Sequence, residues 1–246
     1  LSSVIDIKSK DGNMKRFGFS GNLGPYASNV SLEGPIARDK SSFFISGRKS
    51  TLGWLNEINP ALKSFDISFY DVNAKLNVIL NNKNRFYASF YWGEDMLNRN
   101  TNEALQTYGI SWDNIVGTLR WNHVFSPKLF TNTTFYYSQY NYYLFTSKEL
   151  KDYWNSAIAH VSLKSDFTYY LNPRNTLRSG LEASYYSFNP GNVSISDTAV
   201  QNNAPVVSRY QAMEYVFYIS NDQKIGRKIS VRYGLRLPVW QDFGPT

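Results

Sequence analysis

Five short turns divide the chain at nearly even intervals, at residues 37–40, 81–84, 126–128, 172–175 and 225–227. Roughly ten residues on either side of each turn alternate between apolar and polar side chains, which is the period of two of a β-strand. The connections between one hairpin and the next are mostly longer and irregular. Short turns at one end of the strands and long loops at the other are typical of a transmembrane β-barrel, whose antiparallel strands cross the membrane up and down.

Residues 71–80 show what this alternation requires of the surroundings. One face of the segment carries Val72, Ala74, Leu76, Val78 and Leu80, and the other carries Asp71, Asn73, Lys75 and Asn77. Such a strand needs hydrocarbon on one side and water on the other. The same pattern, with charged residues on one face, recurs in the segments 85–92, 157–171, 177–186, 213–220 and 229–237.

These patterns predict an all-β, transmembrane antiparallel β-barrel fold with about eleven strands. The strands are expected near residues 15–24, 28–36, 41–50, 70–80, 85–95, 110–125, 129–145, 157–171, 176–188, 209–224 and 228–240. The extracellular loops are expected at residues 51–69, 96–109, 146–156 and 189–208. Bacterial single-chain barrels have an even number of strands, and an open sheet in lipid leaves unpaired backbone groups along its edges. We therefore expect the chain to be part of a barrel.

The composition agrees with this fold but also fits a soluble all-β protein. Aromatic residues make up 17% of the 246 residues and charged residues only 18%, and Tyr and Trp are enriched in the interfacial girdles of barrels. The longest apolar run, residues 215–219, is far too short for a membrane-spanning helix, which excludes a helical membrane protein. The absence of cysteine excludes disulfides and thiolate metal sites.

The formal charge of +7 arises in part from basic residues in the short turns. Basic turns alone do not make a nucleic-acid surface, and we predict no nucleic-acid partner. The chain starts at Leu1 without a Met or a signal-like segment. Either a signal peptide has been removed or the sequence begins within a larger protein.

Residue patterns that would indicate enzyme chemistry are weak. Ser46 and Lys49 match the Ser-x-x-Lys spacing of penicillin-binding enzymes, but on a strand they point to opposite faces. His123 and His160 are the only histidines and lack the spacing of a zinc site. The carboxylates of Asp166 and Glu182 are expected on one face together with basic residues, which favours a salt-bridged wall over acid–base catalysis. We predict no catalytic residue, cofactor or metal.

The densest aromatic cluster lies in residues 135–145. Two interpretations remain open: a girdle at the membrane interface, which we favour, and a stacking platform for sugars or peptides at the extracellular mouth. The platform would use Tyr136, Tyr140, Tyr142 and Tyr143.

Four segments resemble the TonB-dependent outer-membrane receptors of the Bacteroidetes type. They are residues 1–7 (LSSVIDI), 10–15 (KDGNMK), 32–36 (LEGPI) and 46–49 (SGRK). The resemblance implies that residues 1–13 are the end of a plug domain and its junction, and that residues 14–246 are the N-terminal half of a barrel of about twenty-two strands. Parity along the strands then predicts the lumen- and plug-facing residues. These are Asp71, Asn73, Lys75, Arg85, Lys164, Asp166, Arg178, Glu182, Glu214, Arg232 and Arg236.

The resemblance implies a receptor in the bacterial outer membrane that imports a substrate by energy-coupled movement of the plug. Its partners would be a TonB-type energy-coupling protein, a surface lipoprotein or a larger envelope complex, and membrane lipid or lipopolysaccharide. The alternative is a receptor-like barrel that serves as a structural subunit of an outer-membrane assembly. A soluble β protein that binds carbohydrate or single-stranded nucleic acid is a third hypothesis, against which the repeated apolar strand faces argue.

Overall fold

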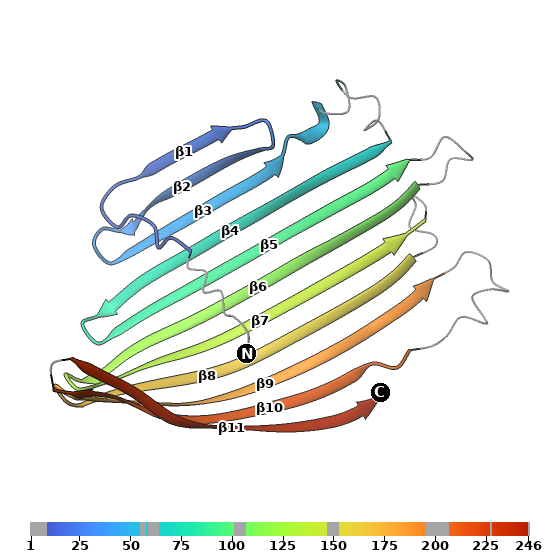
Figure 1. Ribbon diagram of the computed structural model, residues 1–246. Helices are drawn as coiled ribbons and strands as arrows, with labels where there is room; N and C mark the ends of the chain where they lie inside the picture. The colour runs from blue at the N-terminus through green and yellow to red at the C-terminus, as the bar shows by residue number, and fades with distance from the viewer. Residues whose placement is uncertain are drawn as a thin grey trace.

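The computed structural model describes residues 9–54, 58, 64–100, 107–146, 153–194, 207–226 and 228–245. These residues form one antiparallel sheet of eleven strands that follow each other in sequence order. Figure 1 shows the sheet, with the short turns at one end of the strands and the longer connections at the other. The strands are β1 (Gly18–Leu23), β2 (Ala27–Ala37), β3 (Ser41–Ser50), β4 (Phe65–Asn81), β5 (Asn84–Asn100), β6 (Thr107–Ser126), β7 (Leu129–Phe145), β8 (Tyr153–Asn172), β9 (Asn175–Ser194), β10 (Tyr210–Ile225) and β11 (Ile229–Pro245). A 3₁₀ turn, η1 (Leu52–Trp54), follows β3.

The predicted all-β fold is confirmed, and the sheet is open. Within the described residues, β1 pairs only with β2 and β11 only with β10. An open sheet with this up-and-down order is part of a barrel. Of the predicted plug segment, residues 1–8 lie outside the described residues.

The turns are built alike and join the hairpins into a continuous edge. Asn81 and Asn172 each accept a hydrogen bond on Oδ1 from the backbone N–H two residues later, at 2.9 Å in both cases, which is the Asx-turn geometry. The carbonyl of one basic residue in each of four turns accepts a hydrogen bond from the strand beyond the hairpin, at 2.7–2.9 Å. These carbonyls belong to Lys40, Lys83, Lys128 and Arg174.

The strands extend further at the loop end than the sequence predicted. Residues 65–69, 96–100, 153–156 and 189–194 were expected in loops, but they continue strands β4, β5, β8 and β9. In residues 65–69 the alternation is reversed, since Phe65, Ile67 and Phe69 share the face of Lys75, and in the other three segments both faces carry polar residues, so the pattern of the rest of each strand is lost there. Backbone pairing continues nevertheless, because ladder hydrogen bonds do not depend on the side chains. A register shift between Asn155 and Ala157 accommodates Pro190, which has no N–H to donate.

The register sorts the side chains onto two faces with opposite character. One row across six strands contains Leu76, Ala88, Leu119, Phe135, Leu163 and Ala183. The adjacent row contains Lys75, Ser89, Thr118, Tyr136, Ser162 and Ser184. We call the sheet face of the first row the apolar face and that of the second row the polar face.

The burial of these faces is the reverse of that in a soluble protein. Large apolar side chains are exposed on the apolar face, for example Leu119 at 58% and Leu163 at 51%. Among the described residues, the four least exposed side chains are polar, namely Ser42, Asn77, Ser162 and Ser184, and all four lie on the polar face. An apolar surface of this extent requires another apolar phase to cover it. No helix among the described residues is long and apolar enough to span a membrane.

Candidate functional site

The strand register gathers the charged residues singled out in the sequence onto the polar face. Lys164 lies directly opposite Glu182. Asp166 lies opposite Gly180, which is separated from Arg178 along β9 only by Ser179. Following the register from strand to strand places eleven residues on this face. They are Asp71, Asn73, Lys75, Arg85, Lys164, Asp166, Arg178, Glu182, Glu214, Arg232 and Arg236.

The N-terminal segment of residues 9–16, here called the junction segment, lies against the polar face and is held by ionic contacts. The Asp11 carboxylate binds Lys75 Nζ at 2.6 Å and lies 3.8 Å from the Arg85 guanidinium. Lys75 also donates to the carbonyl of Ser9 at 2.9 Å, and the Ser42 hydroxyl donates to the carbonyl of Asp11 at 2.9 Å. Two of the predicted plug-facing residues, Lys75 and Arg85, therefore contact the N-terminal segment.

Gly12 allows the junction segment to approach the barrel wall this closely. Its φ is +79°, a conformation that residues with a Cβ rarely adopt. A Cβ at this position would lie 2.3 Å from the carbonyl oxygen of Phe43, so no other residue fits without a backbone shift. Two residues later, the carbonyl of Met14 accepts a hydrogen bond from the N–H of Asp39 at 3.1 Å.

Several of the remaining charges on the polar face are held by neighbouring side chains. Arg48 Nε donates to Asp71 at 2.6 Å. Lys164 lies 3.4 Å from Asp166, and Glu182 accepts a hydrogen bond from the buried Ser162 hydroxyl at 3.2 Å. Asp166 and Glu182 thus lie on one face with Lys164, which forms an ion pair with Asp166. Within the described residues, no group of three or more acidic or histidine side chains is arranged to hold a metal.

The predicted tyrosine platform is divided between the two faces. Along β7, Tyr136, Tyr140 and Tyr142 project from the polar face, whereas Tyr143 projects from the opposite face. The four residues therefore do not form one surface.

A different group of rings comes together on the polar face around Tyr186. Tyr186 stacks on His160, with ring centroids 4.2 Å apart, and also on Phe188 and Trp240 at 5.8 and 5.5 Å. Tyr136 closes the group with an edge-to-face contact to His160. Sequence reasoning missed this cluster because its members come from four strands. Strand parity together with the register would have revealed it.

Comparisons with known proteins identify solved structures with a similar fold, but no matching family model or curated protein. No family model matches the chain, and no curated protein matches it. Among solved structures, FpvA of P. aeruginosa, in complex with a pyoverdine and Fe, is similar with a TM-score of 0.63 at 9% sequence identity. The siderophore receptor PirA from Acinetobacter baumannii is similar with a TM-score of 0.64 at 12% identity.

Both matches extend over nearly the whole sheet. They cover 93% and 91% of this chain, but only 37% and 38% of the respective receptors. The chain has the fold of the covered part of these two proteins. Because the matches cover only these shares of the two receptors, the chain spans less than two fifths of their length.

Proposed function

We propose that the chain is part of a TonB-dependent receptor in the bacterial outer membrane, where it imports a substrate by energy-coupled movement of a plug. The observation that carries this proposal is the junction segment bound to the polar face through Asp11, Lys75 and Arg85. The barrel fold shared with siderophore receptors supports it.

In this proposal the polar face lines the lumen and the apolar face contacts lipid. The eleven charged and polar residues on the polar face then contact the plug, whose last segment comprises residues 1–13, and residues 14–246 form the N-terminal half of the barrel. A buried lumen wall needs fixed hydrogen-bond partners, which the paired charges and buried serines supply. The polar wall holds the plug in place, and the apolar face anchors the barrel in the membrane.

A TonB-type energy-coupling protein supplies the work by pulling on the plug from the periplasm. The force reaches the barrel wall at the junction segment, where Asp11 is bound. Because this attachment consists of ion pairs and single hydrogen bonds, it can open and re-form without unfolding a strand. This is the mechanical property that a moving plug requires at its hinge.

The tyrosines on the polar face are proposed to contact the substrate at the extracellular mouth, and Tyr143 to belong to the interfacial girdle. Aromatic rings stack on sugars and on planar groups and lose little conformational entropy on binding. Replacing Tyr142 by alanine is then expected to weaken substrate uptake, and replacing Tyr143 is not. An equal loss from both variants would contradict the assignment.

The residues that resemble the Bacteroidetes type support a surface lipoprotein or a larger envelope complex as a further partner. Affinity purification of the full-length receptor from its own outer membrane, with the co-purifying proteins identified by mass spectrometry, tests this part of the proposal. Recovery of the receptor without any stoichiometric lipoprotein would overturn it.

The decisive experiment for transport removes the energy-coupling segment of the full-length receptor and measures substrate uptake by whole cells. Uptake is expected to stop, while the amount of receptor in the outer membrane stays the same. If the cells retain uptake or if uptake never depended on the receptor, active transport is refuted. The scaffold hypothesis then takes its place, provided that deletion of the whole receptor disrupts an envelope complex.

A further inference from the structure

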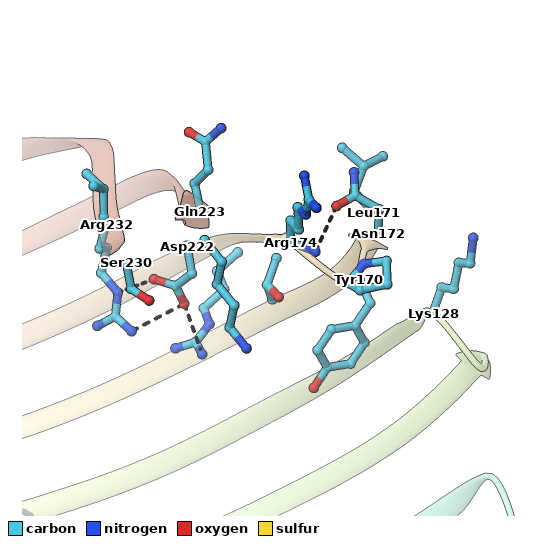
Figure 2. A pocket seen from close by; sticks show the side chains of 14 residues that line it. Lys128, Tyr170, Leu171, Asn172, Arg174, Asp222, Gln223, Ser230 and Arg232 are labelled. Carbon is cyan, nitrogen blue, oxygen red and sulfur yellow. Dashed lines mark hydrogen bonds and ion pairs between the residues drawn. The ribbon is translucent and has the colours of Figure 1, made fainter. Parts of the chain in front are cut away.

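A pocket of about 820 Å³ opens at the short-turn end of the sheet, and we call it the rim pocket. It is lined by the turn between β6 and β7, the turn between β8 and β9, and the ends of β10 and β11. Figure 1 shows the β10–β11 hairpin curving over the turn end of the sheet, and Figure 2 shows the side chains that line the pocket. A pocket of this volume can hold a small molecule or several side chains of another segment.

The side chains that give the rim pocket its character project from the polar face. Asp222 lies opposite Thr176 on β9 and opposite Arg232 on β11. Thr176 and Arg178 have the same parity along β9 as Ser184, a member of the polar row. In the proposed receptor this face lines the lumen, so the occupant of the rim pocket comes from the lumen and not from the lipid.

The rim pocket is strongly basic. Asp222 contributes the only anionic side chain among the lining residues. Five other lining side chains are cationic, namely Lys128, Arg174, Arg178, Lys224 and Arg232. A pocket with such an excess of positive charge favours an anionic ligand.

Asp222 holds two of these cations in fixed positions. Its carboxylate binds Arg178 at 3.2 Å and also accepts hydrogen bonds from Nε and a terminal nitrogen of Arg232. Figure 2 shows the carboxylate between the two guanidinium groups. The two guanidinium groups have more donors than one carboxylate can accept, so both retain donors for a ligand. Within the described residues, no carboxylate partner is present for the other three cations, Lys128, Arg174 and Lys224.

The junction segment shows which kind of anion the polar face receives. On β4 and β5, Lys75 and Arg85 bind the carboxylate of Asp11 in this segment. Arg85 and Arg178 both lie within the first four residues after a short turn, so the contact of Asp11 and the rim pocket are at the same end of the strands. β5 and β9 are four strand spacings apart, which corresponds to roughly 20 Å along the sheet. The remainder of a plug that ends in the junction segment and fills the lumen meets the wall on this side as well.

We propose that the rim pocket binds carboxylate side chains of the plug, from the part that precedes residues 1–13. This inference rests on the proposed function, which places the plug in the lumen. Arg178 and Arg232, which Asp222 orients, offer the planar donor pairs that match carboxylate geometry. The exposed Arg174 and Lys224 add positive charge beside them. The pocket therefore predicts an acidic patch on the plug surface that faces β8 to β11, and a second attachment of the plug to the wall.

The test treats the full-length receptor in isolated outer membranes with a carbodiimide, which joins a carboxylate directly to a lysine amine. The coupled peptides are identified by mass spectrometry. Lys128 or Lys224 is expected to couple to an Asp or Glu of the plug outside residues 1–13. Lys75 Nζ and the carboxylate of Asp11, which lie 2.6 Å apart, are the internal positive control.

The double variant R174Q/K224Q removes two cations from the pocket and leaves the ion pairs of Asp222 in place. One exposed ion pair changes an equilibrium by up to about fivefold, so hydrogen–deuterium exchange of the coupled plug peptide should rise by about 5- to 25-fold. The matched control K40Q/K83Q removes the same charge from two other short turns and should leave exchange of that peptide unaltered. An equal rise in both double variants would overturn the pocket as the site of attachment.

Coupling and exchange are measured without transport. If Lys75 couples to Asp11 while the pocket lysines couple to nothing, or only to carboxylates of the barrel or of another protein, the inference is overturned. A receptor whose pocket lysines couple to the plug but which takes up no substrate would refute the proposed transport and leave this inference standing. A receptor that transports normally without this coupling would overturn the inference alone.

Discussion

Neutralising Asp11 should release the junction segment from the barrel wall without unfolding the sheet. The change is Asp11→Asn, which keeps the size of the side chain and removes its charge. Lys75 would lose its 2.6 Å ion pair while remaining only 15% exposed, with Arg85 still nearby. Two neighbouring cations would then share a site that has lost its anion, and water would have to enter to solvate them.

The size of the effect follows from the exposure of the two partners. A hydrogen bond to a charged group contributes about 1.5–3 kcal/mol. Because Asp11 is 44% exposed, water screens part of this interaction, which leaves about 1–2 kcal/mol. A change of this size corresponds to about a 5- to 30-fold increase in the open population of the junction segment.

Hydrogen–deuterium exchange of the full-length protein measures this population directly. Peptides that cover residues 9–16, and the amide of Asp39 that donates to Met14, should exchange about 5- to 30-fold faster in the Asp11→Asn variant. Peptides of β8 and β9 should not change. The control variant Lys15→Gln removes an exposed charge from the same segment and should leave exchange unaltered.

Two results would refute the reasoning. If exchange in residues 9–16 stays the same after Asp11→Asn, the ion pair does not hold the segment. If exchange rises equally in β8 and β9, the substitution destabilises the whole barrel and the junction is not an independent unit.

Two further predictions concern the backbone and the two faces. Gly12→Ala should detach the junction segment, because its Cβ would collide with Phe43. Gly226→Ala, at a similar φ of +66° with no atom within 4 Å, should cost only about 1–2 kcal/mol of backbone strain. Hydrogen–deuterium exchange of residues 9–16 checks this prediction, and retained protection in Gly12→Ala would contradict it. Leu163→Lys on the apolar face should destabilise the barrel in vesicles by about 2–4 kcal/mol, whereas Thr118→Lys on the polar face should not. Denaturant titration of the vesicle-folded receptor measures both, and equal effects would favour a soluble protein.

Strand alternation predicted the parts of the fold where the two faces meet different surroundings. In β4, the separation of Leu76 from Lys75 was evident from the sequence because one side chain needs lipid and the next needs water. The loop end of β4 could not be recognised, since Asp66 there shares the face of Leu76, and Phe65 and Ile67 share the face of Lys75, which reverses the pattern. Backbone hydrogen bonds pair the strands there, and they impose no periodic pattern on the amino-acid sequence.

The junction contacts lay beyond sequence reasoning for a different reason. Asp11 and Lys75 are far apart in the chain, and the junction segment has no period that would indicate its path. Lys75 could be assigned to the polar face, but its partner could not be named. The aromatic group around Tyr186 shows the same limit, because His160 and Trp240 can be placed beside Tyr186 only once the register of β8 to β11 is known.

The junction segment and the aromatic group around Tyr186 lie on separate parts of the sheet. The junction segment contacts β3 to β5, and the aromatic group draws its rings from β7, β8, β9 and β11. Lys75 on β4 and Tyr186 on β9 are five strand spacings apart, which at roughly 5 Å per strand exceeds the distance within which substitutions usually couple. Opening of the junction segment should therefore leave the packing around Tyr186 unchanged.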